Sequence, residues 1–202
     1  MKKNIKLVLL ILSLTVVIFL IYLIMPKNKQ SCKIVSGDVH IYEEQCLKTG
    51  YVPKNLVILP DRFNWLNVVQ EVDERIEKPL EKMILDAEKD GMCLVVSSGY
   101  RSAEYQGKLV STSDISDFVA PVNGSEHQTG LAVDLQACPM KGGKRDDIVQ
   151  RLELAKPFKE LPEYQWLVEN AGKYGFEQSF KSDNSNITGY PEEDWHWKYI
   201  IK

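Results

Sequence analysis

Histidine is scarce in this chain, which has only His40, His127 and His196 among its 202 residues. Cysteine is scarce too, and four cysteines are too few for a disulfide scaffold in a domain of this size. The sequence contains no internal repeat and no low-complexity tract. A chain of this length is therefore expected to form one domain with a sizeable core.

An excess of positive charge is missing once the N-terminus is set aside. Five of the 25 basic residues, and no acidic residue, lie in the first 30 positions, so 20 basic residues face 28 acidic residues in the remainder. This net charge of −8 argues against nucleic acid or anionic lipid as a substrate, because both favour basic surfaces. It suits a soluble ectodomain.

Charged residues are absent from Leu7 to Met25, a run of 19 residues dominated by Leu, Ile and Val. As a helix, this run is about long enough to cross a bilayer core of roughly 30 Å. Three lysines precede it and favour a cytoplasmic N-terminus, although two lysines follow it and weaken this bias. We therefore predict a cytoplasmic tail (1–6), a single transmembrane anchor (7–25), a juxtamembrane segment (26–60) and an extracellular domain (61–202).

Two other interpretations of the N-terminus are less favoured. A cleaved signal peptide has a shorter apolar core and a small-residue cleavage site, whereas this run ends in Met25-Pro26. A lipoprotein signal needs small residues before its cysteine, but Cys32 follows Lys29-Gln30-Ser31.

The four cysteines allow more than one arrangement. Cys32 and Cys46 flank a short polar segment and form a disulfide in one interpretation, while in the other all four are free thiols, since spacing alone does not fix pairing. Cys93 lies in an apolar run and is expected in the core. Cys138 follows Asp134 by four residues and is expected to be a bystander.

Helical and strand patterns are interspersed without a regular βαβ rhythm, which predicts a single α+β domain. Apolar residues from Ile76 to Ala87 recur on one helical face, with Gly91 as the terminator and Pro79 as a kink or a late start. The other expected elements are strands at 92–96, 130–135 and 195–201, and helices from Ser102 to about 110, near 148–154, and from Pro162 to about 174 ending at Gly175.

Two of the three histidines lie close to carboxylates. His127 and Asp134 are seven residues apart, too far along a rigid helix for one metal, but a turn at Gly130 followed by a strand brings them together. With His196 they form the two-imidazole, one-carboxylate set of an open catalytic zinc shell, which keeps a fourth position for water. Glu193, three residues before His196, is the candidate proton carrier, and Glu192 is the alternative.

Three further polar residues are candidates for substrate binding. Arg101 follows a predicted strand and precedes a helix cap, so its guanidinium can bind a carboxylate or polarise a carbonyl group. Without the histidine motif, a surface arginine would be the simpler interpretation. Ser125 and Gln106 are weaker candidates for hydrogen bonding to the substrate, and His40 receives a structural interpretation.

These motifs resemble the VanY and VanX type zinc D,D-peptidases. The pattern Ser-x-His-x-x-Gly-x-Ala-x-Asp is present at Ser125 to Asp134, and Ser98-Gly99-Tyr100-Arg101-Ser102 resembles that family's Ser-Gly-Tyr-Arg-Ser segment. Near the C-terminus, Gly175-Phe176 and Glu193-Asp194-Trp195-His196-Trp197-Lys198-Tyr199 resemble its Tyr-Gly-Phe and Glu-Pro-Trp-His-Trp-Arg-Tyr stretches. The similarity runs from about residue 65 to the end.

The resemblance implies Zn²⁺ bound by His127, Asp134 and His196, with Glu193 as catalytic base and Arg101 at the substrate carbonyl or carboxylate. It also implies a small antiparallel sheet flanked by helices. The implied reaction removes the C-terminal D-alanine from peptidoglycan stem peptides, with a role in vancomycin resistance for VanY-type members. Two departures from the family pattern, Asp194 for Pro and Lys198 for Arg, leave the implied ligands unchanged.

Two alternatives to a membrane-anchored D,D-carboxypeptidase stay open. An L,D-carboxypeptidase that trims tetrapeptide stems uses the same metal chemistry, and the motifs do not separate the two. A non-catalytic, zinc-containing wall-binding module is disfavoured because a proton carrier is present at Glu193. The sequence does not determine the oligomeric state.

Overall fold

The computed structural model describes residues 32–112, 119–138 and 157–201. Residues Cys32–Lys202 form one compact unit. The predicted tail and anchor (1–6 and 7–25) and the short helix expected at 148–154 lie outside the described residues. Within the described ranges, no helix is both long enough and apolar enough to cross a membrane.

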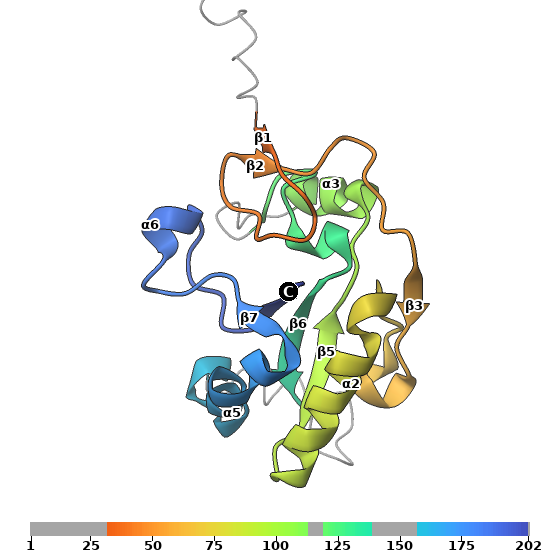
Figure 1. Cartoon of the computed structure of the whole chain (residues 1–202), viewed down its shortest axis with the longest axis vertical. Coiled ribbons are helices and arrows are strands. Elements are labelled where there is room, and N and C mark those ends of the chain that lie inside the picture. The colour runs from red at the N-terminus through yellow and green to blue at the C-terminus, as the bar shows by residue number, and fades with distance from the viewer. Residues whose placement is uncertain (1–31, 113–118, 139–156, 202) are drawn as a thin grey trace, which may run out of the picture. The chain divides into compact units, whose positions relative to one another are not determined.

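A four-stranded antiparallel sheet forms the centre of the domain (Figure 1). Its strands, in spatial order, are β5 (Leu94–Ser98), β6 (Ala132–Ala137), β8 (His196–Tyr199) and β7 (Phe176–Gln178). The mixed α+β fold with a small antiparallel sheet is confirmed. Strand β7, which the sequence analysis missed, is only three residues long and directly follows the predicted terminator Gly175.

The two faces of this sheet differ in chemistry because successive side chains of a strand point to opposite sides. On one face, Val133, Leu135 and Trp197 belong to the main apolar core. On the other face lie the alternate residues of the same strands. Those polar residues are Asp134 of β6 and His196 and Lys198 of β8.

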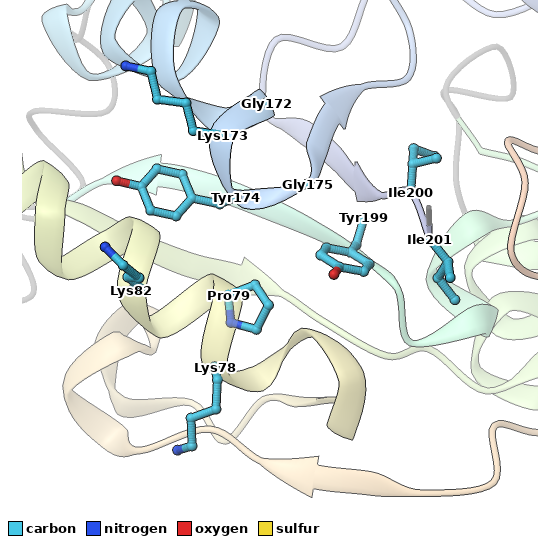
Figure 2. A pocket seen from close by; sticks show the side chains of 10 residues that line it. All are labelled: Lys78, Pro79, Lys82, Gly172, Lys173, Tyr174, Gly175, Tyr199, Ile200 and Ile201. Carbon is cyan, nitrogen blue, oxygen red and sulfur yellow. The ribbon is translucent and has the colours of Figure 1, made fainter.

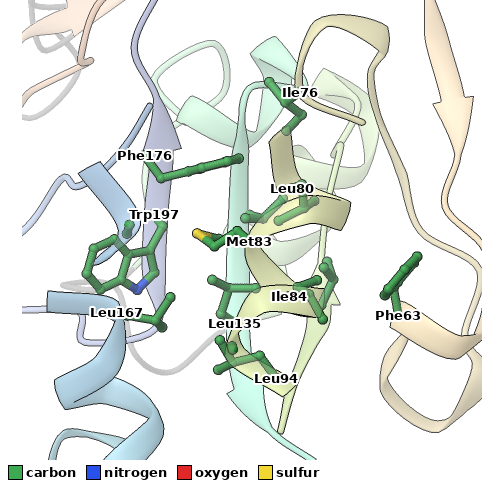
Figure 3. Packing of buried hydrophobic residues seen from close by; sticks show 14 of the residues in the cluster. Phe63, Ile76, Leu80, Met83, Ile84, Leu94, Leu135, Leu167, Phe176 and Trp197 are labelled. Atoms are coloured by element: carbon green, nitrogen blue, oxygen red, sulfur yellow. The ribbon is translucent and has the colours of Figure 1, made fainter. Parts of the chain in front are cut away.

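Helix α2 (Glu74–Lys89) covers the apolar face. Leu80 and Met83 point from α2 toward Leu135 of β6 (Figure 3). All five residues expected on its apolar face are buried: Ile76, Leu80, Met83, Ile84 and Ala87. Gly91 follows the C-cap Asp90 at φ 84°, as expected. Of the two alternatives for Pro79, a kink or a late start, the late start is wrong because the helix runs through Pro79 from Glu74.

The remaining elements are short. Helix α3 (Ala103–Thr112) is capped by Ser102, whose Oγ accepts from the N–H of Tyr105 at 3.1 Å. Helix α5 (Pro162–Asn170) continues into the 3-10 turn Ala171–Tyr174, and Gly175 ends it at φ 88°. The other elements are β1 (Lys33–Ile34), β2 (Gln45–Cys46), β3 (Leu56–Ile58), β4 (Glu71–Asp73), α6 (Ser185–Thr188) and 3-10 turns at Asp61–Phe63, Trp65–Asn67, Glu126–Thr129 and Phe158–Glu160.

Residues 32–60 pack as part of the compact unit. Ile41, Leu47 and Leu59 are almost fully buried, and β3 pairs with β4, which leads directly into α2. The compact unit thus includes residues 32–60, part of the segment predicted to be juxtamembrane. The polar composition of residues 32–60 hides the few buried apolar residues of this segment from the sequence pattern.

Two disulfides form, Cys32–Cys46 and Cys93–Cys138, so the interpretation with four free thiols is wrong. Cys93 and Cys138 flank the paired strands β5 and β6, and the N–H of Cys138 donates to the carbonyl of Cys93 at 2.8 Å. This antiparallel register, which the sequence alone does not reveal, brings the two thiols together across a separation of 45 residues.

Candidate active site

The sheet itself brings Asp134 and His196 together. They are direct partners in the antiparallel pair of β6 and β8, and both point to the polar face. Opposite residues of such a pair have Cβ atoms roughly 4.5–5.5 Å apart. Two candidate ligands 62 residues apart in the sequence are thus fixed side by side by backbone pairing.

His127 reaches the same place from the 3-10 turn Glu126–Thr129, which precedes β6. Gly130 ends this turn in the left-handed conformation at φ 70°, and a Cβ there would lie 2.9 Å from the backbone nitrogen of Asp73. Only glycine meets both conditions without strain. The expected turn at Gly130, folding the histidine back beside the aspartate, is confirmed.

The three candidate ligands present a compact triangle of acceptor atoms. His127 Nε2, His196 Nδ1 and Asp134 Oδ1 are each 3.1 Å from the other two. Tetrahedral zinc with bonds of about 2.0–2.1 Å separates its ligand atoms by about 3.3 Å. The residues present therefore fit a zinc ion, with one position of the tetrahedron left for a fourth ligand.

Hydrogen bonds on the far side of each imidazole fix which nitrogen faces the triangle. His127 Nδ1 donates to the carbonyl of Gly99 at 2.7 Å, and His196 Nε2 donates to the carboxylate of Glu126 at 2.9 Å. In the neutral rings, the facing nitrogens then carry lone pairs. Three lone-pair atoms at 3.1 Å repel one another unless a cation lies among them.

The pKa values of the two imidazoles diverge. Burial, reinforced by the charge of Arg101, lowers the pKa of His127 to about 4. Burial also lowers that of His196, but the hydrogen bonds and charges of Asp134 and Glu126 outweigh it and raise the pKa to about 10. The triangle thus favours one positive charge at neutral pH, which a proton or a metal ion can supply.

Glu193 lies in the turn before β8, with its carbonyl accepting from the N–H of His196 at 3.4 Å. Its Oε2 lies 3.9 Å from His196 Nδ1, and burial raises the pKa of its carboxyl to about 7 against the lowering effect of His196. A carboxyl in this range can take up and release a proton at neutral pH. The alternative, Glu192, is instead bound to Lys159 at 2.5 Å.

Arg101 and Ser125 line a small cavity beside the ligands, together with Glu193, Phe180 and Tyr190. Among the described residues, the buried Nε of Arg101 has no hydrogen-bond partner. An unpaired buried guanidinium nitrogen favours an anionic or carbonyl group of a bound molecule. The cavity measures about 30 Å³, room for one or two water molecules.

Gln106 does not line this cavity. It is buried, and its Nε2 donates to the carbonyl of Ala120 at 2.6 Å, while Ala120 itself lines the cavity. Gln106 therefore holds the wall of the site rather than facing into it.

The sequence analysis missed a buried layer behind the ligands. Glu126 accepts hydrogen bonds from His196 and from His40. His40, for which the sequence predicts a structural role, thus contacts a residue that touches a candidate ligand. Lys198 is fully buried and donates to the carbonyl of Gly37 at 3.1 Å. Because side chains alternate along a strand, Lys198 lies on the same face as His196. The alternation does not indicate that this polar face is buried.

A larger cavity of about 830 Å³ lies elsewhere, between α2 and the end of β8 (Figure 2). Tyr174 and Tyr199 line it together with three lysines. Two of these, Lys78 and Lys82, pair with Glu81 and Asp86. None of the candidate site residues lines this cavity, so its size does not make it the active site.

Comparison with known proteins decides the family. The pattern of the family VanY, D-alanyl-D-alanine carboxypeptidase, matches residues 69–202. The chain belongs to the VanY family. The match includes the ligand triangle, Glu193 and Arg101, while residues 32–68 lie outside it.

Individual VanY relatives agree with this assignment. YodJ of Bacillus subtilis strain 168 is 30% identical over 172 residues, covering 80% of this chain and 59% of YodJ. A D-alanyl-D-alanine carboxypeptidase of Enterococcus faecalis is 28% identical over 147 residues, covering 65% of this chain and 49% of that protein. The chain thus spans about half the length of these relatives.

Two solved structures share the fold. The first is a vancomycin resistance D,D-pentapeptidase VanY in complex with Zn(II), with a TM-score of 0.62 and 25% identity, covering 82% of this chain and 89% of that one. The second is the LD-carboxypeptidase LdcB, with a TM-score of 0.65 and 28% identity, covering 79% and 74%.

Proposed function

We propose that this protein is a zinc-dependent D,D-carboxypeptidase that removes the C-terminal D-alanine from peptidoglycan pentapeptide stems. The ligand triangle carries the proposal: three acceptor atoms lie 3.1 Å apart, each imidazole is fixed from behind, and a further carboxylate, that of Glu193, lies beside them. A purely structural zinc site is usually closed by four protein ligands. Here three protein ligands and a nearby acid favour hydrolysis.

Each residue of the site has a separate part in the proposed reaction. Zinc, when bound to His127, Asp134 and His196, supplies Lewis acidity toward water and the scissile carbonyl group. Glu193 takes a proton from the attacking water and delivers it to the leaving amine. A carboxyl with a pKa of about 7 suits both transfers at neutral pH.

Arg101 is proposed to orient the substrate. A carboxypeptidase substrate ends in a carboxylate, and the guanidinium lines the cavity that also contains Glu193 and Ser125. An arginine–carboxylate contact gives both charge neutralisation and a defined direction. Ser125 is proposed to donate a further hydrogen bond to the substrate.

The proposed location is the outer surface of the cell membrane, with residues 7–25 as a single anchor. The disulfides Cys32–Cys46 and Cys93–Cys138 support an oxidising compartment, because disulfides are rare in the cytosol. A role in vancomycin resistance follows if pentapeptide stems are cleaved there, and it is part of the proposal.

An L,D-carboxypeptidase acting on tetrapeptide stems is the second candidate. It is favoured by the similarity to LdcB, whose identity and TM-score are slightly higher than those of the VanY structure. Both reactions release one terminal D-alanine by the same use of metal, Glu193 and Arg101. They differ in the length of the stem and in the configuration of the residue before the scissile bond, which is D-alanine in the pentapeptide and has an L centre in the tetrapeptide.

One assay tests the reaction and separates the two candidates. The full-length protein, purified in mild detergent, is incubated with a pentapeptide stem ending in D-Ala-D-Ala and, separately, with the tetrapeptide stem. Mass spectrometry measures the loss of one alanine with and without a chelator, followed by zinc addition. Conversion of pentapeptide to tetrapeptide, abolished by the chelator and restored by zinc, is expected.

The other outcomes have defined meanings. Conversion of tetrapeptide to tripeptide alone would replace the D,D activity with the L,D activity. If zinc-loaded protein cleaves neither stem, the hydrolase proposal is wrong and a wall-binding module is favoured.

A further inference from the structure

A buried carboxylate behind the ligands, that of Glu126, has no part in the proposed reaction. The residue is 2% exposed and immediately precedes His127. Its Oε2 accepts from His196 Nε2 at 2.9 Å and from Ser179 Oγ at 2.5 Å. It is therefore in direct contact with a candidate ligand, on the side away from the metal.

The other oxygen is held by the N-terminal part of the domain. Oε1 accepts from the backbone N–H of Ile41 at 2.8 Å and from His40 Nδ1 at 3.1 Å, and Lys198 Nζ lies 3.9 Å away. Ile41 is fully buried and lies in the loop that the Cys32–Cys46 disulfide closes. The position of Glu126 is thus fixed by residues outside the segment that matches the family pattern.

The chemistry of this contact selects a tautomer. A carboxylate only accepts hydrogen bonds, so the proton of a neutral His196 must reside on Nε2. Its Nδ1 then carries the lone pair in the ligand triangle. Such outer partners fix the orientation and basicity of metal-bound histidines, and their loss typically lowers metal affinity by roughly 10–100-fold.

We propose that Glu126 is a positioning residue that presents His196 Nδ1 to zinc, and that the disulfide-closed loop at residues 32–46 supports the metal site through Glu126. This inference rests on the proposed function, because it assumes a zinc ion at the triangle. It extends the site beyond its three ligands to a loop more than 80 residues earlier in the chain.

Glu126→Gln tests the proposal in the full-length protein. The amide keeps the shape of the carboxylate but can donate to His196 Nε2, which moves the ring proton to Nδ1 and blocks the metal-facing lone pair. Zinc affinity, measured by competition with a chelator, is expected to fall by roughly 10–100-fold. Nitrogen NMR of the three labelled histidines, at a free zinc concentration that saturates the wild type, should show His196 as the Nε2–H tautomer in the wild type and a loss of that form in Glu126→Gln.

Glu177→Gln is the matched control. Glu177 lies on the same polar side of the sheet, 3.7 Å from His40 Nε2, but its side chain is 60% exposed and does not contact a ligand. The same loss of one charge is expected to leave zinc affinity and the tautomer of His196 unchanged.

Ser179→Ala serves if Glu126→Gln fails to fold. It removes one of the two hydrogen bonds to Oε2, so a smaller loss of zinc affinity in the same direction is expected. The positioning role is overturned if folded Glu126→Gln binds zinc as tightly as the wild type and keeps the same His196 tautomer. If Glu126→Gln does not fold, the same result in Ser179→Ala overturns it. If the wild-type protein itself binds no zinc, the proposed function fails instead.

Discussion

The two faces of the four-stranded sheet are built from alternate residues of the same strands but are stabilised in different ways. On the core face, Val133, Leu135 and Trp197 pack against α2 and α5, where apolar contact needs no specific direction. On the opposite face, Asp134, His196 and Lys198 are each held by directed hydrogen bonds. Alternate residues of one strand thus contribute to the apolar core and to the candidate site.

The difference lies in what each face tolerates. An apolar side chain can be replaced by another of similar volume at a small cost in stability. A buried polar group that loses its partner is left with the full cost of desolvation. Substitutions on the core face should therefore change stability, and substitutions on the polar face should change zinc binding or catalysis.

The largest expected effect is on catalysis, from Glu193→Gln on the polar face. Removing the proton carrier should lower kcat by about 10²–10⁴-fold, because general acid–base catalysis contributes about this much. The ligand triangle is untouched, so zinc content should be unchanged. The measurement is kcat on the stem peptide that the wild-type protein cleaves, together with metal analysis.

Glu192→Gln is the control for that prediction. Glu192 pairs with Lys159 rather than facing the ligands, so near wild-type activity is expected. Loss of activity in this variant with retention in Glu193→Gln would transfer the role of base to Glu192.

The next largest effect is on stability, from Ile76→Ala on the core face. Ile76 is fully buried in α2, and truncating a buried isoleucine to alanine costs about 2–5 kcal/mol. Urea unfolding of the metal-free protein measures this loss. Zinc affinity of the folded variant should equal that of the wild type.

Ile187→Ala provides the matched exposed site, since Ile187 is 68% exposed in α6. Its free energy of unfolding should change by less than about 0.5 kcal/mol. Equal losses in the two variants would contradict the assignment of the core face.

The two faces also differ in how far the sequence predicted them. The apolar face of α2 was predictable residue by residue, because a helical period repeats the same local signal. The grouping of His127, Asp134 and His196 was predictable from their motifs and from the resemblance to the family. Its geometry was not, because it depends on the register of β6 against β8.

The outer layer of the polar face escaped prediction. Ile41 contacts Glu126 through a backbone N–H, which carries no signal in the residue type. The Cys93–Cys138 pairing likewise depends on the register of β5 against β6. Contacts made by backbone groups, or fixed by register, require the fold before they can be assigned.

The smallest expected effect comes from Asp73, which precedes α2 and contacts the loop that carries His127. Its side chain caps α2 by accepting from the N–H of Arg75 at 3.0 Å, while its own N–H donates to the carbonyl of Gly130 at 2.9 Å. Asp73→Ala removes the cap but keeps the backbone bond to the loop that carries His127. The free energy of unfolding should fall by about 1 kcal/mol, with zinc affinity unchanged.

The pH dependence of the free energy of unfolding separates the contribution of the Asp73 charge from that of its capping hydrogen bond. Burial raises the pKa of this carboxyl, but the hydrogen bonds from the side chain and backbone of Arg75 lower it below its ordinary 3.8. A carboxyl whose pKa is lower in the folded than in the unfolded state adds to stability. This contribution is complete at pH values above the pKa of the unfolded state, and it is lost as the pH falls toward the pKa of the folded state. Asp73→Asn keeps a capping oxygen and loses the charge, so its stability deficit should be constant near neutral pH and shrink below about pH 4. A deficit that does not change with pH in urea unfolding of the metal-free protein would mean that the ion pair with Arg75 contributes nothing, and that the side chain of Asp73 stabilises α2 through its cap alone.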